Sequence, residues 1–405
     1  MPAIKTPFNA TRLAAMLETH GLEAIVATTK ENIRYLTGFS PVVKVLRPYG
    51  GRCYAIVARG TGAAVHVVHS SGEADQVLDA TCEIGQVALY GTFYREYGGW
   101  QTLQLDELQL RSITEQRHIF PTHVAAFREI FTRLGIAEGR VALDEDGITL
   151  PDASELQDSV SERLTWTAGS ALLRSVRQVK TPHEVSILAR AAQILEESYE
   201  HVAHSARIGS TETALVHEFQ RYVVEQGGLP TLAMMKIGRH AVGGQRRQQA
   251  HIALQADDVL WFDCDVQYQD YWADIARVYS AKASSEVERK YTALLHGQRE
   301  AIRRTRPGMT GDDVFHLTMQ AVHAAGFPEY RRHHVGHGIG LEPYEPPILA
   351  PGNTDIIETG AVLSIETPYY EFGVGALHVE DPILVGVAGN ERLTRSSGAF
   401  GRLVM

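Results

Sequence analysis

The stretch VLWFDCDVQYQDYWADIARVYS, Val259–Ser280, decides how the second half of this chain is interpreted. An apolar run leads directly into Asp263, and Asp274 follows eleven residues later. A carboxylate at the end of a buried strand is costly in free energy unless it is paired or bound to a metal ion. One aspartate in such a place is most often a turn cap. The interpretation therefore depends on whether further carboxylates follow the same pattern.

Two more apolar runs carry carboxylates, and a histidine lies between them and the aspartates. VLSIE ends on Glu366, Glu380 lies just before the run PILVGV, and His337 is flanked by glycines in GHGIG. Four carboxylates and one imidazole suit Mn²⁺, Fe²⁺, Co²⁺ or Zn²⁺ better than a thiolate site would. Five ligands exceed the need of one catalytic zinc. They suffice for two metal ions that share ligands and act together on a carbonyl group.

The glycines around His337 have a separate explanation. In HHVGHGIGLEPYEPP, His333–Pro347, they let the backbone fold tightly around a ligand. A phosphate-binding glycine loop is the alternative, but the stretch lacks the lysine and the strand–loop–helix context that such a loop needs. No role is assigned to His334.

Composition places the chain among ordinary globular proteins. Its 405 residues suggest two domains, with 44% hydrophobic and 21% charged residues. A net charge of −10 argues against nucleic acid as the main partner. Three widely spaced cysteines indicate a reducing compartment. No signal peptide or membrane-spanning run is found, so we expect a cytoplasmic protein without a membrane partner.

The order of sequence patterns predicts where the domains meet. Strand-like and helical segments alternate in the first part, which is typical of an α/β domain. The polar stretch Leu150–Ser170 precedes a helix capped by Thr181 and Glu184, with apolar residues at helical spacing behind it. We predict an amino-terminal domain over residues 1–170 and a catalytic domain over 171–405.

The ordered set of candidate ligands resembles the pita-bread metallopeptidase superfamily. That superfamily includes methionine aminopeptidase, aminopeptidase P and prolidase, with creatinase as a metal-free relative. NIRYLTGF (Asn32–Phe39) and RQVKTPHE (Arg177–Glu184) resemble the amino-terminal domain and the domain entry of the creatinase–prolidase branch. The resemblance implies an α/β amino-terminal creatinase-like domain followed by an α+β pita-bread catalytic domain.

The same resemblance implies a role for each ligand. Asp263 would hold one metal ion, Asp274 and Glu380 would bridge, and His337 with Glu366 would hold the other. Glu366 would also manage the proton of the attacking water. The expected cofactor is two divalent metal ions, with Mn²⁺ as first choice and Zn²⁺, Co²⁺ or Fe²⁺ as alternatives.

Relatives of this length also imply a homodimer in which the amino-terminal domain of one subunit borders the site of the other. The aromatic stretch Leu89–Trp100 could contribute there. The alternative for this stretch is a packed surface loop.

The chain departs from the peptide-cleaving relatives at their substrate-binding histidines. His333 fills the position four residues before His337, but Tyr344 lies seven residues after it. About seventeen residues before Asp263 the chain has Arg246 and then Arg247. A small shift would bring His240 or His251 to that position instead.

One further departure lies beside the first aspartate, where Asp265 replaces the usual glycine. It could be a ligand, bind a basic group of the substrate or face solvent. Arg246 or Arg247 could clamp a substrate carboxylate through two hydrogen bonds, or lie in a solvated loop. Tyr344 could donate its hydroxyl to a developing oxyanion, or pack beside the prolines.

The leading functional hypothesis is a dinuclear-metal-dependent hydrolase of a C–N amide bond, similar to Xaa-Pro aminopeptidase or prolidase. His333 would assist in binding a small peptide. The alternative keeps the metal centre but acts on a small molecule, as a creatinase- or ectoine-hydrolase-like amidohydrolase or a DMSP-lyase-like C–S lyase. A third hypothesis is an inactive scaffold for a protein partner, against which the complete set of five ligands argues.

Overall fold

The computed structural model describes residues 7–96, 98–99, 102–115 and 119–403. The chain divides into two compact units, Met1–Arg177 and Gln178–Met405. No helix of the described residues is long and apolar enough to cross a membrane.

The amino-terminal unit is built on a mixed six-stranded sheet of order β4-β3-β2-β1-β5-β6. The strands are β1 (Leu22–Ala27), β2 (Tyr54–Ala58), β3 (Val65–Ser70), β4 (Ile84–Tyr90), β5 (Gly139–Leu143) and β6 (Leu164–Ala168). The helical segments are α1 (Ala10–Thr19), α2 (Lys30–Thr37), α3 (Val42–Leu46), η1 (Ser71–Asp79), α4 (Leu105–Thr114), α5 (His123–Leu134), η2 (Glu145–Gly147), α6 (Leu150–Asp158) and α7 (Ser170–Gln178). Phe127 and Phe131 of α5 are buried in the core that this sheet forms. The predicted α/β class of this domain is confirmed.

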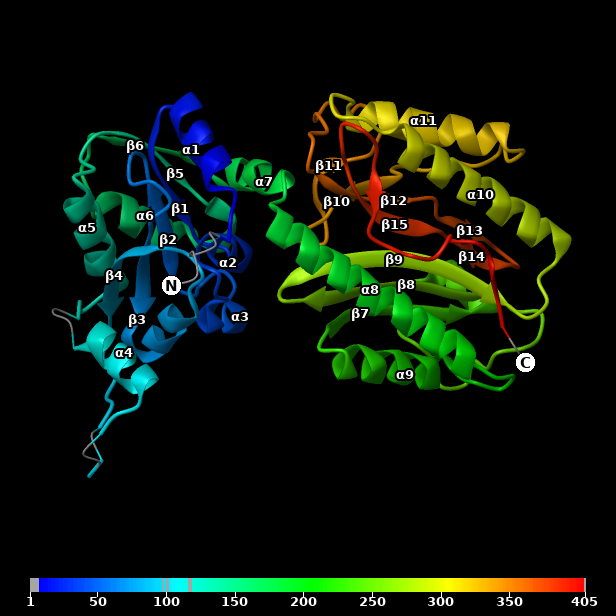
Figure 1. Ribbon diagram of the computed structural model, residues 1–405, viewed down its shortest axis with the longest axis horizontal. Helices are drawn as coiled ribbons and strands as arrows, with labels where there is room; N and C mark the ends of the chain where they lie inside the picture. The colour runs from blue at the N-terminus through cyan, green and yellow to red at the C-terminus, as the bar shows by residue number, and fades with distance from the viewer. Residues whose placement is uncertain (1–6, 97, 100–101, 116–118, 404–405) are drawn as a thin grey trace. The chain divides into compact units, whose positions relative to one another are not determined.

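The second unit contains a nine-stranded sheet whose main path runs β11-β10-β12-β15-β9-β8-β7, with β16 beside β15 and β17 beside β9. Its members are β7 (Leu229–Ile237), β8 (Leu260–Tyr268), β9 (Tyr271–Ser280), β10 (Gly336–Gly338), β11 (Glu345–Ile348), β12 (Val362–Glu366), β15 (Glu380–Leu384), β16 (Glu391–Arg392) and β17 (Gly401–Arg402). Strands β13 (Tyr369–Glu371) and β14 (Gly375–Leu377) form a separate hairpin. Helices α8 (Pro182–Ser205) and α9 (Glu212–Glu225) pack on β7–β9, and α10 (Ser285–Arg304) with α11 (Gly311–Ala324) pack beside the other half (Figure 1). The predicted α+β pita-bread class is confirmed.

Helix α8 fixes the strands that carry the aspartates. The predicted capping box is present, because Thr181 and Glu184 bond each other's backbone at its first turn. Tyr199 lies on its buried side, where its hydroxyl accepts from the Cys264 N–H at 2.8 Å and donates to the Ile275 carbonyl at 2.5 Å. One side chain thus ties the helix to both β8 and β9.

The aspartates lie inside long strands, whereas the apolar pattern suggested strand ends. Strands β8 and β9 form a hairpin through Gln269 and Asp270, which both have positive φ angles of 49° and 71°. Two positive φ values in a two-residue loop match the twist of the strands they join. The resulting register places Asp265 directly opposite Asp274.

Candidate metal centre and active site

Strand pairing brings the five expected ligands together on one face of the second unit's sheet. Glu366 at the end of β12 lies opposite Glu380 at the start of β15, and Glu380 lies opposite Ala276 of β9. His337 of β10 pairs with Ser364 of β12. All five side chains are buried. The residues come from strands far apart in the sequence, so only the sheet register makes them neighbours.

Two groups of three potential ligands share one glutamate. The first comprises Asp274, His337 and Glu380, and the second comprises Asp263, His378 and Glu380, with the ligand atoms of each group within 4.8 Å of one another. In the first group, Nε2 of His337 lies 3.7 Å from Asp274 Oδ2 and 3.8 Å from Glu380 Oε1. Such spacings are open enough to admit a cation between the donor atoms, and the shared Glu380 makes it the natural bridging ligand.

Unpaired polar atoms show that these residues fit divalent metal ions. Oδ1 of Asp274, Nε2 of His337 and both ring nitrogens of His378 are buried and make no hydrogen bond. Buried polar groups without partners are rare because each costs free energy. A set of carboxylate oxygens and imidazole nitrogens is the donor mixture that Mn²⁺, Fe²⁺, Co²⁺ and Zn²⁺ accept.

The raised pKa values of the clustered carboxylates also indicate a site for cations. Burial, and then the charges of Asp265 and Glu380, raise the pKa of Asp274 well above its ordinary value. Burial and the charge of Glu366 do the same to the pKa of Glu380, and burial beside Asp263 raises the pKa of Asp265 to about 7. So many carboxylates in one buried place repel each other, and divalent cations relieve that repulsion.

Hydrogen bonds to neighbouring groups orient the candidate ligands His337 and Glu380. The Gly338 carbonyl, 3.0 Å from Nδ1 of His337, can only accept, so Nδ1 carries the proton and Nε2 is free to bind a metal. Ser364 Oγ donates to Glu380 Oε1 at 2.7 Å. A Cβ on Gly336, whose φ is 142°, would lie 2.1 Å from the Ser364 carbonyl oxygen. This confirms that a glycine beside His337 permits close backbone approach.

Arg277 holds the backbone of Glu380 in place. Its Nη1 donates to the Glu380 carbonyl at 2.7 Å, and its Nη2 donates to Asp381 Oδ1 at 2.6 Å. Asp381 also accepts from Gln298 Nε2 at 2.7 Å and from Thr394 Oγ1 at 2.5 Å. The buried pair therefore fixes the start of β15, where Glu380, the member of both candidate groups, lies.

A cavity of ≈ 740 Å³ opens onto the cluster. Its lining includes Asp263 and Glu366 together with His333, Tyr344 and Arg246, three of the residues that the sequence predicted. A volume of this order suits a small-molecule or dipeptide ligand.

The other two predicted substrate-binding residues lie elsewhere among the described residues. Arg247 is exposed and does not line this cavity. Asp265 is buried beside Asp274 and is likewise not part of the cavity lining.

Tyr344 lies directly against a metal-ligand candidate. Its ring stacks on that of His337 with centroids 3.7 Å apart. Burial and the charge of Glu366 raise the pKa of the Tyr344 phenol far above its ordinary value, so the hydroxyl stays protonated.

The sequence interpretation missed three functional candidates. Nε2 of His334, to which no role was assigned, lies 2.7 Å from Glu366 Oε1, while the neighbouring His333 is exposed. Arg332 lines the cavity with its guanidinium 5.9 Å from the centre of the Tyr370 ring. His378 lies beside three carboxylates, and its spacing of two residues from Glu380 was the available signal, since alternate residues of an extended chain share a face.

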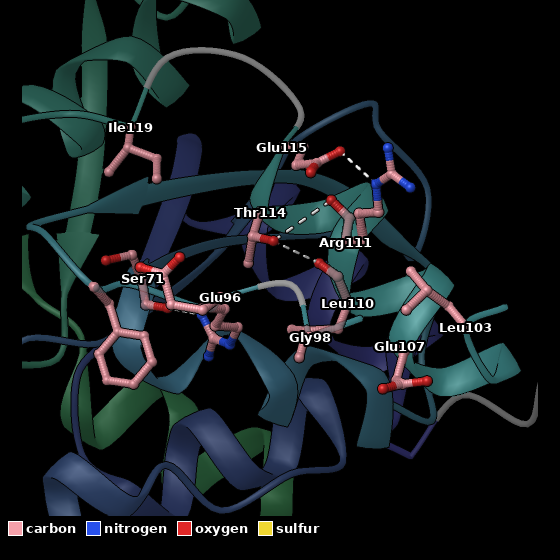
Figure 2. A pocket seen from close by; sticks show the side chains of 12 residues that line it. Ser71, Glu96, Gly98, Leu103, Glu107, Leu110, Arg111, Thr114, Glu115 and Ile119 are labelled. Carbon is pink, nitrogen blue, oxygen red and sulfur yellow. Dashed lines mark hydrogen bonds and ion pairs between the residues drawn. The ribbon is translucent and has the colours of Figure 1, made fainter. Parts of the chain in front are cut away.

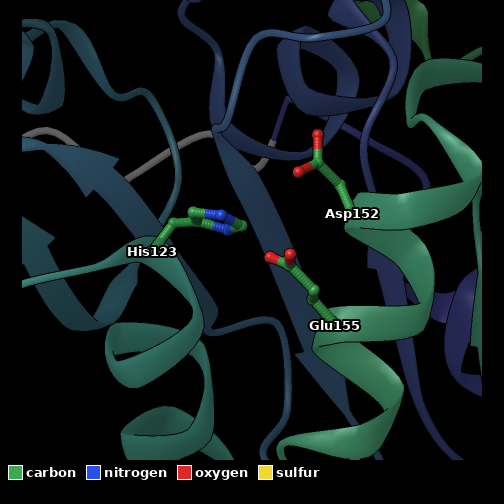
Figure 3. A group of neighbouring side chains, drawn as sticks. All are labelled: His123, Asp152 and Glu155. Atoms are coloured by element: carbon green, nitrogen blue, oxygen red, sulfur yellow. The ribbon is translucent and has the colours of Figure 1, made fainter.

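A third potential metal group lies in the amino-terminal unit, where His123 of α5 faces Asp152 and Glu155 of α6 (Figure 3). Two of its members already have protein partners, and the third, Glu155, is exposed. Asp152 Oδ1 accepts from Arg52 Nη2 at 2.8 Å, and Nδ1 of His123 lies 3.2 Å from the Tyr54 hydroxyl. These partners account for the group as part of the packing.

A cavity of ≈ 370 Å³ in the same unit is lined by Leu110, Arg111 and Thr114 of α4 (Figure 2). It includes part of the aromatic stretch Leu89–Trp100. Arg95 stacks on Phe93 and donates to the Ser71 carbonyl at 2.9 Å, so these residues pack on η1. Tyr97 and Trp100 lie outside the described residues.

Comparison with known proteins agrees with the geometry. Residues 186–386 match the model of metallopeptidase family M24, and residues 10–179 match that of the creatinase/prolidase N-terminal domain. The chain belongs to metallopeptidase family M24 and carries the creatinase/prolidase N-terminal domain. It is therefore a member of a metal-dependent hydrolase family.

Individual relatives are distant. An uncharacterized peptidase of Bacillus subtilis, YqhT, is 24% identical over 383 residues, which cover 93% of this chain and 94% of the relative. An Xaa-Pro dipeptidase from Bacillus anthracis has a TM-score of 0.78 at 21% identity, covering 97% of this chain and 99% of its own. The prolidase from Pyrococcus furiosus has a TM-score of 0.71 at 17% identity, covering 95% and 99%. At such identities the structural likeness shows the fold.

Proposed function

We propose that this protein hydrolyses the C–N amide bond of a short substrate that carries a free carboxylate, in the manner of an Xaa-Pro dipeptidase or prolidase. The observation that carries the proposal is one cavity lined by the carboxylates Asp263 and Glu366 and by two arginines, Arg246 and Arg332. Two divalent ions, Mn²⁺, Zn²⁺, Co²⁺ or Fe²⁺, would be held by Asp263, Asp274, His337, Glu366 and Glu380. Bound there, they would polarise the scissile carbonyl and acidify a water.

The arginines give the substrate its orientation. A guanidinium binds a carboxylate through two parallel hydrogen bonds, which fixes direction as well as position. Nε of Arg332 is buried and makes no hydrogen bond with the residues that the structure describes. A carboxylate at one end of the substrate would accept a hydrogen bond from that nitrogen. The amide bond would then lie beside Asp263 and Glu366.

Glu366 is placed to move the proton. Burial opposes its ionisation, but the imidazoles of His334 and His378 outweigh burial and hold the pKa of Glu366 well below its ordinary value. An ionised carboxylate can take a proton from the attacking water and pass it to the leaving nitrogen. Tyr344, held protonated against His337, can donate its hydroxyl to the carbonyl oxygen as negative charge develops.

A second candidate is an enzyme of the same centre that acts on a small non-peptide amide or on a C–S bond. The observation that favours it is that Arg246 and Tyr344 line the cavity where the resemblance expects peptide-binding histidines. Asp265, buried against Asp274, is a further departure from the peptide-cleaving pattern.

The test compares substrates that differ only in the anchoring charge. The purified protein is stripped with a chelator and reloaded with Mn²⁺, Co²⁺ or Zn²⁺. It is then assayed on Xaa-Pro dipeptides, on the same dipeptides with an amidated carboxyl end, and on tripeptides. We expect cleavage of the free-acid dipeptides, abolished in Asp274→Ala, and a KM about 10- to 150-fold higher for the amides, since a charged hydrogen bond contributes about 1.5–3 kcal/mol.

Matched variants assign the preference to particular residues. Arg332→Met and Arg246→Met should raise KM for the free acids and leave KM for the amides nearly unchanged. Arg331→Met, the exposed neighbour outside the cavity lining, is the control and should change neither. No hydrolysis of any peptide by the metal-loaded protein would refute the proposal and turn the screen to small amides and sulfonium compounds.

A further inference from the structure

His378 occupies a place in the centre that the five-ligand scheme leaves unexplained. It follows β14 and lies two residues before Glu380. Its side chain is 2% exposed to solvent. Nδ1 lies 3.5 Å from Asp263 Oδ2, and Nε2 lies 3.1 Å from Glu366 Oε2 and 3.4 Å from Glu380 Oε2. The ring is thus enclosed by three of the carboxylates assigned to metal ions.

The groups that face this ring are all carboxylates that are themselves candidate metal ligands. Among the described residues neither buried nitrogen has a well-aligned hydrogen bond, although the carboxylate oxygens lie within ion-pair distance. One ring nitrogen lies 3.5 Å from Asp263 Oδ2 and the other 3.4 Å from Glu380 Oε2, distances that leave room for a shared cation. An imidazole nitrogen is also among the most frequent metal ligands.

Without His378, the two groups of candidate ligands would differ in their number of nitrogen donors. Asp274 and Glu380 have the imidazole of His337 in their group, whereas the carboxylate Asp263 has no nitrogen donor beside it except His378 among the described residues. We propose that His378 is a sixth protein ligand, which binds through one ring nitrogen the ion held by Asp263 and Glu380. Each of the two ions then has one imidazole.

This assignment changes which metals the centre favours. Each added nitrogen donor favours Zn²⁺, Co²⁺ and Fe²⁺, while sites made only of carboxylates and water suit Mn²⁺ and Mg²⁺. With one imidazole on each ion, the wild type should favour Zn²⁺ or Co²⁺ over Mn²⁺ by a larger factor than His378→Gln does in the same equimolar competition. The inference rests on the metal centre of the proposed function and does not depend on the substrate.

The test counts imidazoles on the bound metal. X-ray absorption spectra of the full-length protein, loaded with two equivalents of Zn²⁺ or Co²⁺, should show about one imidazole per metal ion. His378→Gln should lower the count to about one half per ion and weaken binding of one ion more than about tenfold. His337→Gln is the positive control for losing a ligand. His334→Gln removes an imidazole beside the same Glu366 and should leave the count unchanged.

The outcomes separate this inference from the proposed function. A wild-type count of one half per ion at full loading, or an unchanged spectrum in His378→Gln, would overturn the ligand role even if dipeptides are cleaved. A count of one per ion with no peptide cleavage would support the ligand and reject the substrate. Circular dichroism verifies that each variant is folded. If His378→Gln does not fold, the imidazole count of the wild type still decides.

Discussion

Replacing Lys180 by methionine should destabilise the metal-binding unit more than any exposed substitution. Nζ of Lys180 lies 2.9 Å from Glu345 Oε2, and the two side chains are 1% and 0% exposed. Oε1 of Glu345 accepts the N–H groups of Leu341 and Glu342 at 3.1 and 3.3 Å. The carboxylate thereby shapes the turn that carries Tyr344 to His337.

The size of the effect follows from burial. Removing one partner of a buried ion pair leaves an uncompensated charge and costs about 3–5 kcal/mol. Methionine keeps most of the lysine volume, so Lys180→Met isolates the charge from the packing. Adding Glu345→Gln removes the stranded charge while its side-chain oxygen still accepts the two N–H groups. We therefore expect the double variant to lose only about 1–2 kcal/mol.

Urea unfolding at pH 7.5 and fixed metal concentration, followed by far-ultraviolet circular dichroism and tryptophan fluorescence, gives the free energies. Lys282→Met, at an exposed lysine, is the control and should stay within about 0.5 kcal/mol of the wild type. A loss below about 1 kcal/mol in Lys180→Met, or a double variant less stable than the single one, contradicts the reasoning.

Four other predictions concern stability, catalysis and metal binding. Burial raises the pKa of Glu184 from 4.5 to about 7, so the folded state binds the proton more tightly and stability falls as pH rises through that window. Relative to the wild type, the free energy of unfolding of Glu184→Gln should rise by up to about 3 kcal/mol as the pH increases from 4.5 to 7. Parallel curves of unfolding free energy against pH would contradict this. Tyr344→Phe keeps the stacked ring and should lower kcat about 100-fold with an unchanged melting temperature, whereas an unchanged kcat would show a packing role. Arg277→Met should weaken metal binding about 10–100-fold in a chelator competition, because it frees the start of β15, and unaltered affinity would argue against that support. Chelation should lower the melting temperature and metal return should restore it, because cations bind only the folded cluster, and no shift on either step would speak against a metal centre.

The sequence alone predicted the chemical elements of the centre. Asp263, Asp274, His337, Glu366 and Glu380 were recognisable because apolar runs lead into or out of carboxylates and glycines flank the histidine. The start of α8 was also predictable, since a capping box depends only on residues three apart. These features are local, and local patterns are what a sequence displays directly.

The tertiary structure decided which neighbours those residues have. His334 rather than His333 reaches Glu366, and neither spacing nor residue type distinguishes two adjacent histidines. Asp265 faces Asp274 because of the β8–β9 register. Period-two alternation assigns a side chain to a face, but cross-strand register depends on pairing between distant segments.

His378 is the clearest case of this division. The sequence places it two residues from Glu380, which puts both on one face, yet its approach to Asp263 and Glu366 requires the pairing of β12, β15 and β9. The sequence by itself determined the fold class and the main candidate ligands, because both rest on short-range patterns. Only the folded sheet decided which side chains lie beside these candidates and which line the cavity, because those are properties of long-range packing.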